Sequence, residues 1–298
     1  MNTIDVIDLH FQSEESIASF LIPSSDGLIL IESGPESTWK NLEKGIIDLG
    51  YKTEDIKHVF LTHIHFDHAG AAWKLAEKGA TIYVHPIGLP HMANPEKLWN
   101  SASQIYGDDM DRLWGKMRPI PENQLKAVDD GDEITIGEHK INVWYTPGHA
   151  IHHNAYQIND IIFTGDVAGV KIENGPVQPP CPPPDINLDL WIKSIAKLKA
   201  LNPSTLYLTH FSRQENPIAL LEELENRLYS WANWIKPYFD SQAPIAEVTP
   251  KFVEFTKQEL IASGLTQHEI KRYEYANPSF MSVTGLYRYW KLKSEGRI

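Results

Sequence analysis

The stretch THIHFDH at residues 62–68 places three imidazoles and one carboxylate within six consecutive positions. It follows the apolar, strand-like run Val59–Leu61, and Gly70 frees the chain just beyond it. A strand that ends in a tight turn can direct such side chains into one pocket, where imidazole and carboxylate suit Zn, Fe or Mn. A solvated, histidine-rich loop is the alternative, but the apolar strand before it disfavours that interpretation. The stretch therefore predicts a metal site.

Three later apolar runs end in the same way, in a residue type that can bind metal. They are residues 143–145 before His149, residues 161–163 before Asp166, and residues 206–208 before His210. Each one alone would be an ordinary cap or turn residue. Together with the first stretch they form an ordered series of four, which indicates one shared site.

The composition is that of an ordinary globular protein. Hydrophobic residues make up 42% of the 298 residues and charged residues 22%, which argues against a disordered or fibrous chain. The 27 Lys and Arg against 39 Asp and Glu give a formal net charge of -12. This charge disfavours nucleic acid as a partner, although a local basic patch would still be compatible with it. We therefore expect a small-molecule substrate.

Cysteine content and the start of the chain bear on location. Cys181 is the single cysteine, so no internal disulfide can form and a reducing compartment is suitable. Asp5 and Asp8 stand where an export signal would need a basic start and an apolar run. The apolar runs are strand-sized, far below the roughly 20 residues of a membrane-spanning helix. We expect a cytoplasmic protein without a membrane partner, and a homodimer is compatible with the sequence.

β-type and helical patterns alternate along the chain, which predicts an α/β (α+β) protein. Residues 1–215 form the predicted catalytic region. Within it, the β pattern lapses over about residues 86–128 and predicts an inserted helical cap. Residues 169–184 are rich in proline and predict an extended loop. Residues 216–298 have a helical pattern and predict a C-terminal extension.

The order and spacing of the predicted ligands resemble the metallo-β-lactamase superfamily, in which an HxHxDH motif precedes a His, an Asp and a His at later strand ends. The resemblance extends from Ile4 to about Phe211 and fills all seven ligand positions. It implies an αββα sandwich, with two facing sheets between outer helices and the metals at one edge. By the same resemblance, one metal ion would bind His63, His65 and His149, the other would bind Asp67, His68 and His210, and Asp166 would bridge them.

The resemblance further implies a metal-dependent hydrolase. Two divalent ions, Zn first with Fe or Mn as alternatives, would activate water as hydroxide against a small or medium ester, thioester or lactone. Asp67 and His68 are the residues of the motif that we also expect to take part in catalysis. Two alternatives stay open. A phosphodiesterase or ribonuclease would use the same metals, whereas a persulfide dioxygenase-like oxidoreductase would bind one iron through His63, His149 and Asp166.

Two positions narrow the branch of the superfamily that the chain resembles. True β-lactamases of the family usually carry Cys at the position of Asp166, and flavin-linked di-iron members carry Glu at the position of His65. Neither is present, so the motif resembles glyoxalase II-like thioesterases and lactonases. The chain departs from many members at Glu32 and Ser33, where an Asp is usual. One of these two residues must therefore orient a ligand here.

Further predictions concern the surroundings of the metals. His152 and His153 follow His149 closely and are expected to support the ligands or pack beside them, while His85 and His91 are expected to line the cleft under the cap.

The walls of this cleft are predicted to come from the helical insert and the loop of residues 169–185. Trp99, Tyr106 and Trp114 of the insert and the prolines of the loop make these walls apolar. Such a pocket should prefer acyl compounds to polyanions, because several phosphates would lose water without gaining Lys or Arg partners.

Overall fold

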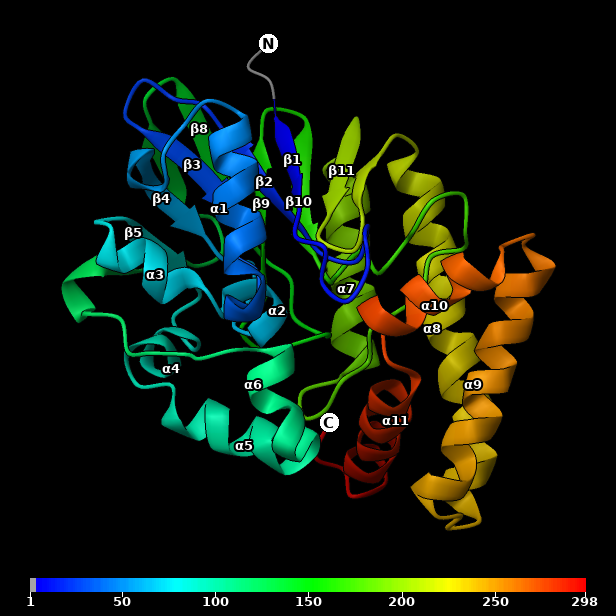
Figure 1. Cartoon of the computed structure of the whole chain (residues 1–298). Coiled ribbons are helices and arrows are strands. Elements are labelled where there is room, and N and C mark those ends of the chain that lie inside the picture. Colours follow the sequence, from blue (N-terminus) through cyan, green and yellow to red (C-terminus); the bar gives the residue numbers. More distant parts are fainter. Residues whose placement is uncertain (1–3) are drawn as a thin grey trace.

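Two β-sheets packed face to face form the centre of the molecule, and helices cover their outer sides (Figure 1). This computed structural model describes residues 4–298, so the first three residues of the predicted catalytic region lie outside it. The order of layers is helices, sheet, sheet and helices. The predicted α/β class and the αββα sandwich are confirmed.

The first sheet combines antiparallel and parallel pairing. In spatial order it contains β1 (Asp5–Asp8), β2 (Ala18–Ile22), β3 (Leu28–Ile31), β4 (Ile56–Phe60), β5 (Thr81–Val84) and β6 (Leu125–Ala127). Strands β1 to β3 pair antiparallel, and β3 to β6 pair parallel. Every residue of β2 and β3 is buried, which explains their continuous apolar runs, since both faces of these strands are covered.

The second sheet is mostly antiparallel. It contains β7 (Glu133–Ile136), β8 (His139–Tyr145), β9 (Asn154–Ile158), β10 (Ile161–Gly165), β11 (Thr205–Leu208) and β12 (Ser212–Gln214), in that spatial order. The pair β10 and β11 is parallel, and helix α7 (Leu188–Ala200) makes the crossover that a parallel pair requires.

Aromatic side chains fill the space between the sheets. The ring centroids of Phe20 and Phe163 lie 5.4 Å apart, and those of Phe60 and Tyr156 lie 5.2 Å apart. All four side chains are buried. Each such side chain stabilises the fold by roughly 1.5–3 kcal/mol, so these contacts hold the two sheets against each other.

Short helices cover the first sheet. They are α1 (Trp39–Asp48), α2 (Phe66–Ala69) and α3 (Ala72–Glu77). Elsewhere in this half of the chain, short 3-10 turns occur at Glu36–Thr38, Thr53–Asp55, Gly107–Asp109 and Glu122–Gln124. In α1, Leu42 and Ile46 are one turn apart and both are buried, because an amphipathic helix presents one apolar stripe to the sheet.

The helical insert lies at the lower end of the molecule in Figure 1 and contains α4 (Leu89–Ala93), α5 (Glu96–Tyr106) and α6 (Met110–Leu113). One element inside the range expected to be helical is a strand. β6 pairs with β5, from Leu125 opposite Ile82 to Ala127 opposite Val84. Three residues are too few to show a β period in the sequence, which is why this strand was not predicted.

The C-terminal extension is helical, as the sequence predicts. Its helices are α8 (Pro217–Asp240), α9 (Ile245–Ala262), α10 (Gln267–Ala276) and α11 (Ser279–Ser294). Leu224 and Trp231 of α8 and Leu286 of α11 belong to the same buried cluster as Leu206 of β11 and Trp191 of α7. The extension therefore shares one hydrophobic core with the second sheet and its covering helix.

The proline-rich loop of residues 169–184 is extended and contains no helix, as predicted. Val170 forms a bridge to Gln178, and Val177 and Cys181 are buried beneath the extension. Among residues 4–298, no helix combines the length and the apolar character needed to cross a bilayer.

Candidate metal centre

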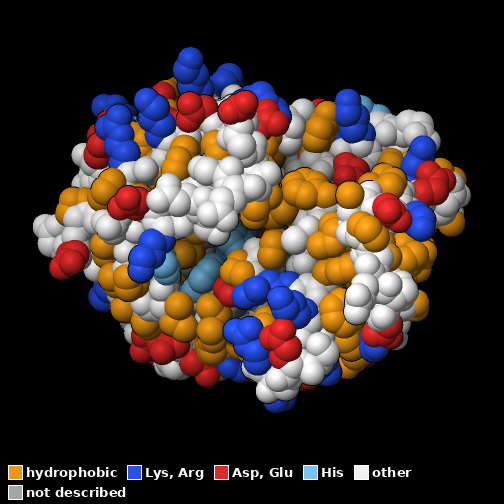
Figure 2. Space-filling view, turned by 90° about the horizontal axis from the view of Figure 1, so that it is seen from below, with side chains coloured by type: hydrophobic (Ala, Val, Ile, Leu, Met, Phe, Trp, Pro, Cys, Tyr) orange, Lys and Arg blue, Asp and Glu red, His pale blue; other side chains and the backbone are white. Residues whose placement is uncertain are grey.

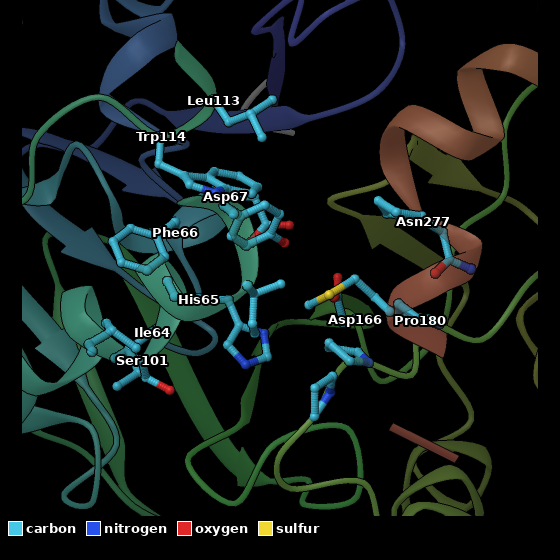
Figure 3. Close-up of a pocket in the computed structure, with 18 of the residues that line it drawn as sticks. Ile64, His65, Phe66, Asp67, Ser101, Leu113, Trp114, Asp166, Pro180 and Asn277 are labelled. Carbon is cyan, nitrogen blue, oxygen red and sulfur yellow. The ribbon is translucent and has the colours of Figure 1, made fainter. Parts of the chain in front are cut away.

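Seven His and Asp side chains meet at the edge of the sandwich where β4, β8, β10 and β11 end. Figure 3 shows His65, Asp67 and Asp166 around a common cavity. The structure thus brings together every predicted ligand, in three overlapping groups whose candidate ligand atoms lie within 4.8 Å of one another. The groups are His63, His65 and His149; His63, His68 and Asp166; and Asp67, His68 and His210.

The first group presents three ring nitrogens to one point. His65 Nδ1 lies 2.9 Å from His63 Nε2 and 3.1 Å from His149 Nε2. The side chain of His63 is fully buried and that of His149 almost so. Nitrogen lone pairs that converge this closely repel each other, and a cation between them turns the repulsion into coordination.

Asp67, His68 and His210, called the second group from here on, combine a carboxylate with two imidazoles. His210 Nε2 lies 3.4 Å from Asp67 Oδ2, and His68 Nε2 lies 3.6 Å from the same oxygen. Asp166 stands between the groups, because its Oδ2 lies 3.3 Å from His149 Nε2 whereas its Oδ1 lies 3.3 Å from His68 Nε2. Each oxygen of Asp166 therefore faces a different group, as a bridging ligand requires.

The two groups fit divalent metal ions. Three buried atoms, His68 Nε2, His210 Nε2 and Asp166 Oδ1, have no hydrogen-bond partner among the described residues. Buried polar atoms are normally paired, since an unpaired one costs about 1–3 kcal/mol. Imidazole nitrogens with carboxylate oxygens form the donor set that suits Zn, Fe or Mn. The three unpaired atoms belong to the second group and to the bridging Asp166, so a bound metal ion would supply the partner that each of them lacks.

The protonation of the histidines also suits a metal site. Burial lowers the pKa of His63 well below its usual value and that of His65 to about 3, so both rings are neutral and can donate a lone pair. Burial also opposes the charged form of His68, but the carboxylates of Asp166 and Asp67 outweigh it and raise the pKa of His68 well above its usual value. Negative charge is therefore in excess around the second group.

Glu32 orients the ring of His68, one member of the second group, by a hydrogen bond. Its Oε1 accepts a hydrogen bond from His68 Nδ1 at 3.1 Å and another from the Thr62 hydroxyl, and it is fully buried. Thr62 Oγ1 in turn accepts a hydrogen bond from His63 Nδ1 at 3.0 Å. Of the two residues left open by the sequence, Glu32 thus orients the ligands. Ser33 instead donates from its hydroxyl to the carbonyl of His68 at 3.0 Å.

Backbone carbonyls orient two further rings. His149 Nδ1 donates to Pro180 O at 2.8 Å, and His210 Nδ1 donates to Ser16 O at 2.5 Å. Each bond directs Nε2 toward the cluster, as is usual for metal-binding histidines. The sequence carries no signal for these carbonyls, because every residue type has one.

His153 and Gly148 support the neighbouring ligands. His153 Nε2 accepts a hydrogen bond from the backbone N–H of Asp166 at 3.2 Å, and its Nδ1 donates to the Thr146 hydroxyl at 2.8 Å. Gly148, at φ +136°, passes so close to α7 that a Cβ would lie 2.3 Å from the Cα of Trp191. The residue before His149 must therefore be glycine. The expected supporting role of His153 is present in the structure.

The C-terminal extension is hydrogen-bonded to the two loops whose backbone carbonyls orient His149 and His210. Asn277, between α10 and α11, donates to Pro179 O at 3.3 Å, next to Pro180. Arg272 of α10 donates to Glu14 Oε1 at 2.5 Å and to Glu15 Oε2 at 2.6 Å, next to Ser16. We call these contacts the extension clamp. The clamp thus links the extension to the residues next to Ser16 and Pro180, whose carbonyls hold His210 and His149.

A cavity of about 800 Å³ opens beside the cluster. Figure 2 looks into this end of the molecule and shows a hollow with histidine side chains at its base and hydrophobic side chains along much of its border. His91 and His152 line the cavity, as does Trp114. His85 does not: its Nε2 lies 3.4 Å from Asp129 Oδ1 and its ring stacks on Tyr145, so the prediction that it lines the cleft is wrong.

The insert and the proline-rich loop line this cavity as predicted, through Tyr106 and Trp114 among others, but the prediction for Trp99 is wrong because its ring packs against Phe66 outside the lining. The structure adds a third wall. Residues 274–278, Phe280 and Met281 of the extension also line it, and so do Phe11 and Ile17 near the N-terminus. Figure 3 shows Asn277 and Pro180 opposite Trp114. Contacts between segments more than 160 residues apart leave no local pattern, so this wall was missed.

The fold and the cluster together define the class of protein: the chain belongs to the metallo-beta-lactamase superfamily. The model of that family matches residues 14–210, from the loop before β2 to the last predicted ligand, His210.

Two relatives by sequence have names that refer to the metallo-beta-lactamase fold or to a metallo-hydrolase. The metallo-beta-lactamase fold-containing protein ST1585 of Sulfurisphaera tokodaii is 29% identical over 161 residues, which cover 53% of this chain and 61% of that protein. The probable metallo-hydrolase YqgX of Bacillus subtilis is 31% identical over 50% of this chain and 64% of its own length. The chain thus matches less than two thirds of the length of these two relatives.

A hydroxyacylglutathione hydrolase of Idiomarina loihiensis is 25% identical over 222 residues, covering 71% of this chain and 68% of that enzyme. Among solved structures, a metallo-beta-lactamase family protein from Thermus thermophilus covers 98% of this chain and 94% of its own, with a TM-score of 0.70 and 18% identity. That likeness shows the fold, and because it covers almost the whole chain, it includes the C-terminal extension.

Proposed function

We propose that this protein is a metal-dependent hydrolase that cleaves a small or medium ester, thioester or lactone with two divalent metal ions, Zn in the first instance. The observation that carries the proposal is the pair of ligand groups joined by Asp166 beside a largely apolar cavity. The relative named hydroxyacylglutathione hydrolase supports a thioester among these candidates.

The predicted ligands would hold one ion at His63, His65 and His149 and the other at Asp67, His68 and His210. Such ions lower the pKa of water and polarise a carbonyl oxygen. Asp67 lines the cavity, and its side chain is 21% exposed. Although burial opposes it, His68 lowers the pKa of Asp67 to about 2, so Asp67 stays ionised and can accept a hydrogen bond from the attacking water.

The rest of the site positions and encloses the reaction. Glu32 fixes the ring of His68, and Pro180 O fixes the ring of His149. The apolar walls keep bulk water from the carbonyl carbon, which strengthens every electrostatic interaction at the centre. The buried single cysteine agrees with a reducing compartment, and a cytoplasmic location is part of the proposal.

Metal analysis and a substrate panel test the proposal. Protein purified without chelator should contain two Zn, Fe or Mn per chain, and chelation should abolish activity that added metal restores. The loaded protein is then offered an acyl thioester, a lactone and a bis-aryl phosphodiester at equal concentration. If kcat/KM for the phosphodiester is the largest by tenfold, about 1.4 kcal/mol, the acyl assignment is wrong. One iron per chain with oxygen consumption would exclude hydrolysis.

A further inference from the structure

One side of the cavity is lined by aromatic rings that contact one another. The ring of Trp114 stacks on Phe11 at 5.3 Å and lies 6.0 Å from Phe66. Tyr106 meets the edge of Trp114 at 5.2 Å. All four residues line the cavity. We call this set of rings the aromatic arm, and it begins at Phe66, the neighbour of the predicted ligands His65 and Asp67.

The extension closes the arm from the opposite side. Phe280, the second residue of α11, lines the cavity, and its ring centroid lies 6.4 Å from that of Tyr106 at an interplanar angle of 81°. Leu113 and Trp114 lie on one side of the cavity in Figure 3, with Asn277 on the other. A ligand that reaches from the metal centre into the arm would therefore lie between the insert and the extension.

Two cationic side chains, Lys97 and Arg112, line the cavity, and both residues are exposed. Arg112, at the exposed border, is paired with Asp109 at 2.8 Å and offers no free charge to an anion. Inside the arm, the Tyr106 hydroxyl has no hydrogen-bond partner among residues 4–298. Tyr106 lines the same cavity as Asp67, and burial, with a smaller contribution from the charge of Asp67, raises the pKa of Tyr106, so its O–H remains a donor.

We infer that the aromatic arm binds the apolar acyl group of the substrate, that this group is longer than a butanoyl chain, and that Tyr106 donates a hydrogen bond to a substrate oxygen. The inference rests on the proposed function and names its substrate class. A cavity of about 800 Å³ is far larger than an acetyl or butanoyl group needs, and it lies in the range of pockets that bury a whole medium-sized ligand.

A series of thioesters of one small thiol tests the chain length. Each methylene buried in the arm should raise kcat/KM about fourfold, equivalent to about 0.8 kcal/mol. The four additional methylenes of the octanoyl thioester should therefore raise kcat/KM up to about 250-fold over the butanoyl thioester when all four are buried in the arm. An increase of less than tenfold would overturn the inference.

Phe280→Ala tests the role of the extension. Phe280 is 39% exposed, so its truncation leaves the core intact. The ratio of octanoyl to butanoyl kcat/KM should fall at least fivefold, whereas Ile261→Ala, a truncation at a similarly exposed position on α9 outside the cavity, should leave the ratio unchanged. An unchanged ratio in Phe280→Ala would contradict the assignment.

Tyr106→Phe removes the donor and keeps the ring. We expect kcat/KM to fall about tenfold at every chain length, as loss of a hydrogen bond of about 1.4 kcal/mol would cause, without a change in the chain-length ratio. Tyr229→Phe, on the exposed surface of α8, is the matched control. A variant with unaltered kcat/KM would remove Tyr106 from the proposal.

Binding of octanoate, followed by tryptophan fluorescence, separates this inference from the proposed function. Octanoate should bind the zinc-loaded protein more tightly than butanoate, and Phe280→Ala should weaken it at least fivefold. If octanoate binds in this way but no thioester, ester or lactone is cleaved, the arm is correct and the hydrolase proposal fails. If butanoyl esters are cleaved but octanoate shows no advantage, the hydrolase stands and the arm is wrong.

Discussion

Asp166 is the residue on which both halves of the candidate metal centre depend. Its two oxygens face His149 and His68, each at 3.3 Å, so its removal affects both ligand groups. We predict that Asp166→Ala loses most of both metal ions and nearly all activity, whereas His210→Ala loses mainly one ion. Metal content per chain by elemental analysis tests this, with Asp160→Ala in the exposed turn before β10 as control. Two retained ions and normal turnover would refute the bridging role.

Glu32 would affect a metal ion at the second group through His68, whose ring it holds. Glu32→Gln keeps the shape of the side chain but removes the charge that holds the His68 ring through its Nδ1–H. Substitutions of this kind weaken metal binding by about 10–100-fold, so we expect such a loss at the second group and little change at the first. Competition titration with a chelator measures it, and Glu222→Gln on α8 is the exposed control. Equal weakening of both ions would indicate a general structural effect instead.

Among the larger elements, the C-terminal extension contributes to the metal centre without carrying a predicted ligand. Arg272 of α10 is 11% exposed and binds Glu14 and Glu15 beside Ser16, whose carbonyl holds His210. α11 also packs tightly on the proline-rich loop, since a Cβ at Gly285 would lie 2.0 Å from Cys181 O. Removal of the extension should therefore disturb the centre as well as the core.

Arg272→Ala tests the extension clamp. We predict a lower melting temperature and, after correction for unfolded protein, several-fold weaker binding of the ion at Asp67, His68 and His210. Thermal unfolding with and without metal gives both quantities. Lys271→Ala, at the exposed neighbouring position, should change neither. A variant that loses stability but binds both ions normally would limit the clamp to a purely structural role.

For the molecule as a whole, the single cysteine is sealed in the core shared by the sandwich and the extension. Cys181 is buried, and burial raises the pKa of its thiol, so the reactive thiolate is scarce even at pH 8. We predict no labelling by a disulfide reagent in the folded state, one label per chain in denaturant, and a melting temperature that reducing agent leaves unchanged. Fast labelling without denaturant would show that the extension opens away from the proline-rich loop.

The sequence by itself determined the superfamily, the order of layers and the seven candidate ligands. This was possible because the ligands lie in the short segments that follow four apolar strands, and strands that end at one edge bring their following residues together. It also indicated that Glu32 or Ser33 orients a ligand, without deciding between them.

Only the tertiary structure decided what surrounds the ligands. The choice of Glu32, the carbonyls of Ser16 and Pro180, and the wall formed by α10 and α11 all depend on contacts between distant segments. Every residue type has a backbone carbonyl, so the sequence does not mark the carbonyls that bind the ligands. When a helix packs on a loop more than 90 residues away, neither segment shows a sequence pattern that reveals the contact. His85 failed as a cleft residue for the same reason, since its orientation is fixed by Asp129 and Tyr145 and not by its neighbours in the chain.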